Sequence, residues 1–386
     1  MLISPATRAE GERRLAAFLP RAGAAYTRSR NLDLPGHPHV SGLSPYLRHR
    51  LITEAEVIAA TRAAHPSGAD AFLAEVWWRT YWKGWLEQRP GIWAAYLRGV
   101  EAGLNRMATE DLLQARVHTA CLGRTGIDGF DDWARELAET GYLHNHARMW
   151  FASIWIFTLR LPWELGADFF LRHLLDGDPA SNTLSWRWVA GLHTPGKTYL
   201  ATAENIAVNT EGRYRPKGLA TTAPTLPMVP HPAPGPLPRD GDWRRGGPGV
   251  LLVTEDDMTP EFLCDQGFAP RAVALLQTTA GRSSLRIAPH VERFATAGLR
   301  DTASRLAHPG APLLDTDLTA LADWAASTGA HQIVTPHAPA GPAQTALGRL
   351  APLLAQRGLT LTRALRDDDR AACPMQPTAS FGSANR

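Results

Sequence analysis

The sequence predicts a protein of two domains, an all-helical domain followed by a Rossmann-like α/β domain with a parallel sheet. With 386 residues, the chain is longer than one ordinary hydrophobic core requires. Residues 1–219 place apolar side chains at helical spacing, whereas residues 250–386 alternate short apolar runs with helical patterns. Residues 220–249 are rich in proline, which is typical of a semi-rigid extended linker.

The helical prediction for the first domain depends on two long segments. In "AFLAEVWWRTYWKGWL" (71–86) and "WARELAETGYLHNHARMWFASIWIF" (133–157), apolar residues recur at intervals of three and four. Eleven of the thirteen tryptophans lie in the first 217 residues, and signals typical of strands are scarce there.

The second domain is expected to hold a parallel sheet with helices on both faces. Its strands are predicted at "VLLVT" (250–254), "AVALLQ" (272–277), "APLLDT" (311–316), "HQIVTP" (331–336) and "LTLTRAL" (359–365). Helical patterns lie between most of these runs, and this alternation is typical of parallel sheets. The first strand is followed by neither a GxGxxG motif nor a P-loop, so no nucleotide fingerprint is predicted.

Composition and charge exclude several classes of protein. No apolar run reaches the roughly 18 uncharged residues of a membrane helix, and the N-terminal residues lack the pattern of a signal peptide. A net charge of +3 is too small to indicate a nucleic-acid partner by itself. Because the three cysteines are scattered, we expect a protein of a reducing compartment, the cytoplasm, without disulfides. We also expect no bound metal ion and no membrane segment.

The segment "LLDGDPASNTLSWRWVAG" (174–191) combines groups that are unusual in a core. Asp176 and Asp178 flank one glycine, and an amide and two tryptophans follow. A buried carboxylate is costly without a partner, and Arg148 is the candidate partner for Asp176. The pair is either an ordinary structural ion pair or part of a ligand site.

The segment "EVWWRTYWKGW" (75–85) places charged groups among tryptophans. Glu75, Trp78, Arg79 and Trp82 follow one helical stripe. Such aromatic stripes more often belong to a core, but the interleaved charges favour the wall of a cleft for a flat π ligand or an unstacked base.

Two further segments offer polar groups to such a cleft. Ser41 and Ser44, in "HVSGLSPYL", precede a predicted helix, where they either bind a phosphate or cap the helix. One face of the helix around "HNHARMW" carries Tyr142, Asn145 and Met149.

Five segments, taken together in their order and spacing, resemble the flavin-binding domain of the photolyase/cryptochrome family. They are "YTRSRN", "SGLSPYL", "FLAEVWWRTYW", "TGIDGFDDWARELAETGYLHNHARM" and "LLDGDPASNTLSWRWVAG". The resemblance covers about residues 15–217 and implies a helical domain that holds a U-shaped FAD at its centre.

The resemblance also implies which residues contact FAD. Contacts to its phosphates and ribityl chain are implied for Tyr26, Ser41, Leu43 and Ser44. The residues implied to surround the flavin ring are Arg79, Asn145, Arg148, Asp176, Asp178 and Asn182. Asn182 matches the position that faces the flavin N5, where the repair branch of the family carries Asn.

A flipped cyclobutane pyrimidine dimer in UV-damaged DNA is the implied substrate. Glu75 and Trp78 match residues that hydrogen-bond to the dimer and stack on it, and Met149 matches another contact. Tyr142 stands where the family often has Trp, and His146 stands where an Arg often contacts a DNA phosphate. Asn145 and Met149, in place of two histidines, argue against (6-4) lesions.

Photoreduction in the family uses a chain of three tryptophans. Trp186 and Trp163 match the first two, but no tryptophan lies between Trp93 and Trp133 to supply the third. Either Trp155 or Trp150 takes the place of the third tryptophan, or the chain is shorter.

The resemblance therefore implies a light-dependent, monomeric flavoprotein that repairs pyrimidine dimers. The alternatives are a photoreceptor that signals through its flavin redox state and a flavin-binding scaffold without a light function. The α/β domain resembles the antenna domain that precedes the flavin domain in the family, so the order is expected to be circularly permuted. The usual Arg-rich loop after its first strand is absent, so the sequence does not decide whether this domain binds a second, antenna chromophore.

Overall fold

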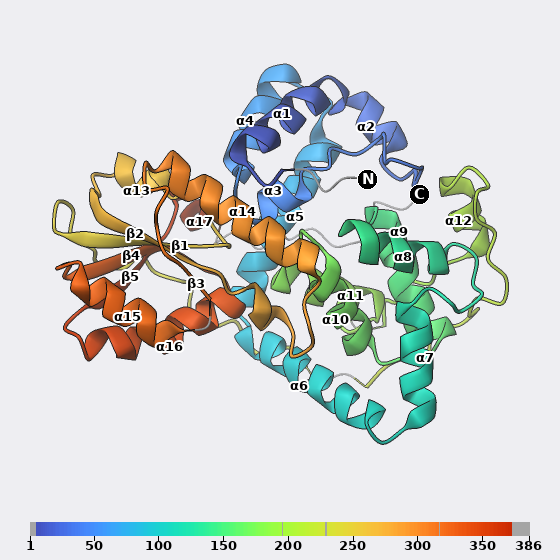
Figure 1. Ribbon diagram of the computed structural model, residues 1–386. Helices are drawn as coiled ribbons and strands as arrows, with labels where there is room; N and C mark the ends of the chain where they lie inside the picture. The colour runs from blue at the N-terminus through green and yellow to red at the C-terminus, as the bar shows by residue number, and fades with distance from the viewer. Residues whose placement is uncertain (1–4, 195, 228–229, 316, 373–386) are drawn as a thin grey trace.

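The computed structural model describes residues 5–194, 196–227, 230–315 and 317–372. Helices of the first 209 residues form one part of the molecule, and a sheet with its covering helices lies beside them (Figure 1). The prediction of a helical fold combined with a parallel sheet is confirmed. Cys373, like the residues after it, lies outside the described residues.

The helical part begins with short helices and continues with longer ones that pack on an aromatic core. Its helices are α1 (Arg8–Phe18), η1 (Leu19–Arg21), α2 (Ala24–Ser29), α3 (Ser44–Arg48), α4 (Glu54–Ala64), α5 (Asp70–Glu87), α6 (Pro90–Met107), α7 (Asp111–Cys121), α8 (Phe130–Thr140), α9 (Asn145–Ser153), η2 (Ile154–Thr158), α10 (Trp163–His173), α11 (Pro179–Val189) and α12 (Ala203–Asn209).

The sheet has five parallel strands in the order β3-β2-β1-β4-β5. The strands are β1 (Gly249–Thr254), β2 (Pro270–Leu276), β3 (Leu313–Leu314), β4 (Gln332–Pro336) and β5 (Thr360–Ala364). The helices of this part are α13 (Glu261–Asp265), η3 (Thr279–Arg282), α14 (Pro289–Arg305), α15 (Leu318–Ser327), α16 (Pro342–Ala355) and α17 (Asp367–Ala372). Each predicted apolar run overlaps one of the strands, and β1 and β2 begin one and two residues before their runs.

The two faces of the sheet pack against different partners because successive strand residues point to opposite sides. Val250 and Leu252 face the core formed with α15 and α16. Leu251 and Val253 belong to a core that also contains Phe72 of α5 and other residues of the N-terminal helices. The α/β part and the helical part therefore share a hydrophobic core.

Residues 220–248 connect the two parts without regular structure in the described positions. This segment lies along the helical part: the Gly235 N–H donates to the Gln88 carbonyl oxygen at 2.7 Å, and the His231 ring packs against Trp85. The connection is anchored to the helical part at these points.

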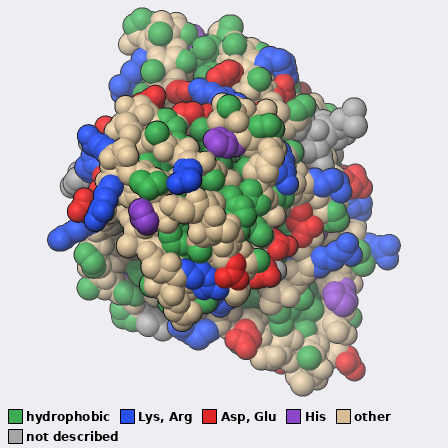
Figure 2. All heavy atoms as spheres, turned by 60° about the vertical axis from the view of Figure 1, so that its left-hand side comes forward, with side chains coloured by type: hydrophobic (Ala, Val, Ile, Leu, Met, Phe, Trp, Pro, Cys, Tyr) green, Lys and Arg blue, Asp and Glu red, His purple; other side chains and the backbone are tan. Residues whose placement is uncertain are grey.

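The surface offers no uniform sign of charge on the face that Figure 2 shows. Basic and acidic side chains are interspersed there (Figure 2). A DNA backbone is bound chiefly through phosphate neutralisation by Lys and Arg, so this face is a poor candidate for that contact. Within the described ranges, we find no helix that is both long and apolar enough to span a membrane.

Ion pairs complete the contact between the two parts. Arg50 pairs with Glu54 at 3.2 Å, with Asp257 after β1 at 3.2 Å and with Asp369 of α17 at 2.5 Å. Arg366 forms a second pair with Asp257 at 2.6 Å. Asp257 is buried, and its two arginine partners offset the cost of removing the carboxylate from water.

The pH dependence of stability provides a test of this contact. Burial alone would raise the pKa of Asp257, but Arg366 and Arg50 lower it from 3.8 to about 2. A lowered folded-state pKa stabilises the fold above the unfolded value, and that stability is lost as the pH falls from about 4 towards 2. The full contribution is about 2 kcal/mol, of which roughly half is lost by about pH 3.

We therefore expect Asp257→Asn to unfold more easily than wild type at pH 7, in urea titrations followed by circular dichroism. The difference between the two proteins should shrink as the pH falls from 5 to 3. A difference that stays constant over this range would contradict the assignment.

Candidate functional site

The expected ion pair between Arg148 and Asp176 is present. Arg148 Nη2 donates to Asp176 Oδ2 at 2.8 Å, and Arg148 Nε donates to the Leu143 carbonyl oxygen at 2.9 Å. Burial alone would raise the pKa of Asp176, but the Arg148 guanidinium holds it below its ordinary value. Asp176 is therefore a buried carboxylate that stays charged near neutral pH.

Asp178 and Asn182 lie at the start of α11. Asp178 caps this helix by accepting a hydrogen bond from the Ser181 N–H at 2.7 Å, and Pro179 occupies the first helical position. Burial opposes its charge, but Arg48 and then Lys83 hold the pKa of Asp178 well below its ordinary value. Asn182 Nδ2 donates to the Ala167 carbonyl oxygen at 2.8 Å, which orients the amide.

Several buried polar atoms around these carboxylates lack a hydrogen-bond partner among the described residues. They include Nε and Nη2 of Arg79, Oγ of Ser44 and Oδ1 of Asp176. Ser44 lies close enough to Asp176 to lower the pKa of that carboxyl group, but without good hydrogen-bond geometry. Arg79 lowers the pKa of both Asp176 and Asp178, so the three side chains are neighbours.

Unpaired buried polar groups call for an explanation, and a polar ligand is one. Arg79 can donate to a carbonyl or phosphate oxygen, and the Ser44 hydroxyl can donate or accept. These donors and acceptors fit the carbonyl, ring nitrogen and phosphate groups of a flavin dinucleotide. The arginine and serine groups are supplied by α5 and α3, far apart in the sequence.

The residues implied for the FAD phosphates are less closely grouped. Ser41 Oγ accepts a hydrogen bond from the Leu43 N–H at 3.3 Å, directly before Ser44. Tyr26 instead packs its ring against Phe18 at 5.7 Å and Phe72 at 5.3 Å. The structure therefore brings the serines together but places Tyr26 in an aromatic cluster.

The two residues implied to contact a lesion lie one turn apart on α5. Trp78 stacks on Trp82 with 5.9 Å between ring centroids, and its side chain is partly exposed. Glu75 accepts a hydrogen bond from Arg30 Nη1 at 2.6 Å. The sequence did not identify Arg30 as a site residue, although it lies within "YTRSRN". Arg30 and Glu75 are 45 positions apart, and no local pattern indicates a contact over that separation.

The remaining implied substrate residues surround the start of α9. The ring centroids of Tyr142 and His37 are 4.9 Å apart. The Arg148 Cζ atom lies over the Tyr142 ring, 5.8 Å from its centroid. His146 stacks on Trp150, and its Nδ1 lies 3.0 Å from the Asn31 carbonyl oxygen. Burial lowers the pKa of His146, so this ring is a weak replacement for a cation that binds phosphate.

Asn145 and Met149 have different surroundings on the same helix. Asn145, the first residue of α9, is exposed, and Met149 is partly buried. Both are accessible to a ligand from solvent.

The two tryptophans implied in electron transfer lie in separate aromatic contacts. Trp186 meets Trp155 edge to face at 6.4 Å. Trp163 packs against Tyr96 at 5.9 Å, and Tyr96 stacks on Trp93 at 5.1 Å. Tyr96 and Trp93 were not selected from the sequence.

Close packing of α6 on α10 produces this second contact. A Cβ atom on Gly99 would lie 2.7 Å from Glu164, and one on Gly103 would lie 2.9 Å from Leu165. Glycines at these positions let the helices approach, and the residue one turn earlier on α6 then reaches Trp163. The spacing Trp93, Tyr96, Gly99 and Gly103 was the signal available in the sequence.

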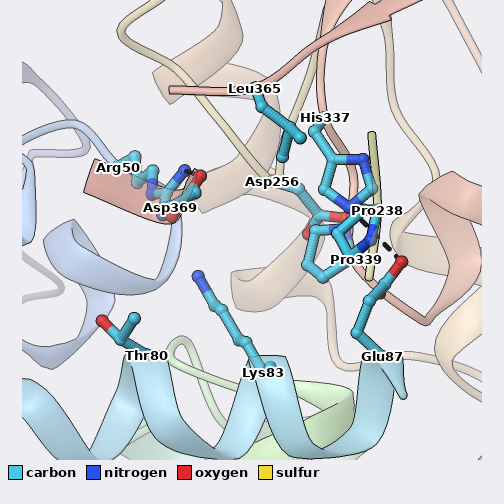
Figure 3. Close-up of a pocket in the computed structure, with 11 residues that line it drawn as sticks. Arg50, Thr80, Lys83, Glu87, Pro238, Asp256, His337, Pro339, Leu365 and Asp369 are labelled. Atoms are coloured by element: carbon cyan, nitrogen blue, oxygen red, sulfur yellow. Dashed lines mark hydrogen bonds and ion pairs between the residues drawn. The ribbon is translucent and has the colours of Figure 1, made fainter. Parts of the chain in front are cut away.

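A polar pocket lies between α5 and the carboxyl end of the sheet (Figure 3). Lys83 points into it from α5, and on the other side His337 pairs with Glu87 at 3.3 Å (Figure 3). The carboxyl ends of β1 and β4, where the strand order reverses, are the usual ligand site of such sheets. The free volume is only about 50 Å³, whereas ligand pockets usually have about 300 Å³ or more. An aromatic chromophore does not fit in this pocket.

Comparisons with known proteins agree with the helical site. Residues 72–215 match the family model of the FAD binding domain of DNA photolyase. The chain is 36% identical over 165 residues to a deoxyribodipyrimidine photo-lyase from Streptomyces griseus and 31% identical over 222 residues to one from Thermus thermophilus. These alignments cover 41% and 55% of this chain, but only 35% and 49% of the relatives.

A solved structure, a class III photolyase from Agrobacterium tumefaciens, is 26% identical with a TM-score of 0.45. The similarity covers 53% of this chain and 42% of that one.

The matched segment contains Arg79, Arg148, Asp176, Asp178 and Asn182, so the site lies in a helical flavin-binding domain. This part of the chain is similar to the FAD binding domain of DNA photolyase, and the chain spans less than half the length of these two relatives. FAD is accordingly the cofactor of the matched domain, and the described residues contain no cluster of side chains that could hold a metal ion.

Removal of one carboxylate tests the assignment. Asp176→Asn leaves the Arg148 guanidinium without a charged partner, which costs about 1–3 kcal/mol of unfolding free energy. Because Asp176 belongs to the site, we also expect weaker FAD binding, measured by the flavin fluorescence of the reconstituted protein. The control is Asp168→Asn, which breaks a similar buried pair with Arg172 at 2.7 Å on α10. An equal loss of FAD affinity in both variants would contradict the assignment.

Proposed function

We propose that this protein is a blue-light-dependent, FAD-containing enzyme that repairs cyclobutane pyrimidine dimers in DNA. The observation that carries the proposal is the match of residues 72–215 to the FAD binding domain of DNA photolyase, in the same segment as the buried charge cluster. Relatives named deoxyribodipyrimidine photo-lyase support it. The α/β part is then an antenna-like domain placed after the flavin domain, and we expect a cytoplasmic monomer.

The chain's own residues have two roles beside the cofactor in this reaction. Bound FAD, when reduced and excited by light, supplies the electron that splits the dimer. Arg79 and Arg148 place positive charge beside the buried carboxylates and favour a negatively charged ring. Trp78 offers a face on which a base flipped out of the duplex can stack.

Glu75 is the candidate acceptor for a thymine N–H, but its carboxylate already accepts from Arg30. To bind a lesion, the Glu75 carboxylate must either accept from Arg30 and from the thymine N–H together or release Arg30 and accept from the thymine alone. The second candidate function, a photoreceptor that signals through its flavin, is favoured by this pairing and by the weakly basic His146.

Lesion binding by Trp78 provides the test. Trp78→Ala should weaken binding to dimer-containing DNA by about 1–3 kcal/mol, roughly ten- to a hundredfold, because one stacking face is lost. Trp77→Ala is the matched control, since Trp77 is exposed on another side of the same helix. Binding is measured by fluorescence anisotropy, and repair is measured as restored absorbance under blue light with a reductant. Wild type that binds damaged and undamaged strands equally and repairs neither would favour the photoreceptor.

The outer donor of the photoreduction chain can be tested separately. Trp150 and Trp155 are fully buried, whereas Trp93 is 7% exposed and is joined to Trp163 through the Tyr96 ring. In such a chain Trp186 would be the residue next to the flavin, Trp163 the second member and Trp93 the outermost member, reached across the Tyr96 ring. An external thiol would return one electron to oxidised Trp93, losing its proton to solvent and becoming a thiyl radical.

Trp93→Phe should therefore shorten the lifetime of the tryptophan radical seen by transient absorption after a flash. Trp150→Phe, the control, should leave this lifetime unchanged. If Trp93→Phe has no effect, the chain ends at Trp163.

A further inference from the structure

We propose that the α/β part builds one wall of the flavin site, with Arg282 and Asp256 as positioning residues for the turn from Leu174 to Asp178. This inference rests on the proposed function only in naming FAD as the ligand of that turn. The turn carries both site carboxylates, and it joins the end of α10 to the start of α11.

The last carbonyl groups of a helix have no partner within the helix. At the end of α10, three successive carbonyl oxygens are bound by residues of the α/β part. The bonds are Ala288 N–H to Arg172 O at 3.0 Å, His290 Nε2 to His173 O at 2.8 Å, and Arg282 Nη1 to Leu174 O at 3.3 Å. The α/β part thus caps the helix that leads into the turn.

The turn itself is held from α3, and α3 is held from the loop after β1. Arg48 Nε donates to the Gly177 carbonyl oxygen at 3.0 Å and lies 3.5 Å from Asp178. The other side of the same guanidinium pairs with Asp256 at 2.5 Å. All three charged side chains are at least 95% buried, so each needs its partner to offset the cost of removing its charge from water.

Arg282 reinforces this arrangement from below the turn. It is 1% exposed, and its nearest charges include Arg48, Glu255, Asp256 and Asp178. A Cβ atom on Gly177 would lie 2.9 Å from Arg282 Nη1, so the guanidinium lies directly against the turn. Loss of this side chain would remove one of two hydrogen bonds to the Leu174 carbonyl oxygen, the other coming from the Gly177 N–H at 3.1 Å, and would leave the space beneath Gly177 empty.

The first measurement is hydrogen exchange of amides 174–182 in the cofactor-free protein. Arg282→Ala and Asp256→Asn should exchange faster there than wild type, whereas Arg282→Lys, which keeps a donor for Leu174, should recover protection. Asp369→Asn is the matched control, because it removes a pair with Arg50 in the same interface without touching the turn. If Arg282→Ala fails to fold, Asp256→Asn decides the outcome.

The second measurement is FAD affinity of the reconstituted full chain, with the flavin absorption spectrum as a separate readout. Weaker binding and a shifted spectrum in Asp256→Asn, but not in Asp369→Asn, support the proposal. Unchanged exchange at 174–182, or an equal loss of FAD affinity in Asp369→Asn, overturns it. Wild type that binds FAD without repairing DNA rejects the proposed function alone, because the exchange result does not depend on repair.

Discussion

The arrangement of the site depends on one constraint, that Asp178 and Asp256, buried where the helical and α/β parts meet, must be paired with Arg48. Asp178, Arg48 and Asp256 alternate in sign from the start of α11 to the loop after β1. Removing an ion from water costs several kcal/mol, and only a well-placed partner offsets it. The positions of the turn, of α3 and of the β1 loop are therefore coupled.

This coupling explains why the molecule does not divide cleanly at its proline-rich connection. Apolar residues of β1 share a core with Phe72 and the N-terminal helices, and Arg50 pairs with both Asp257 and Asp369. A helical part without its α/β partner would expose this apolar surface and leave buried arginines unpaired. The helical fold and the flavin site thus depend on residues from both ends of the chain.

The same contacts fill the place where many α/β proteins bind a ligand. The carboxyl ends of β1 and β4 face α5, and Lys83, Glu87 and His337 are among the residues that line the small pocket between them (Figure 3). In this protein the switch point of the sheet supports the neighbouring domain. The unpaired polar atoms of Arg79 and Ser44 lie instead in the helical part.

The sequence by itself determined the helical and strand segments, because a helical periodicity of three to four and a short apolar run are both local properties. It also determined the pair Arg148–Asp176, since a buried carboxylate needs a cation and one lay on a predicted neighbouring helix. Only the tertiary structure decided that Arg30 binds Glu75, that Tyr96 meets Trp163, and that Arg282 caps α10. Arg282 and Leu174 are 108 positions apart, and no local pattern encodes such a contact because it arises from how whole helices and the sheet pack.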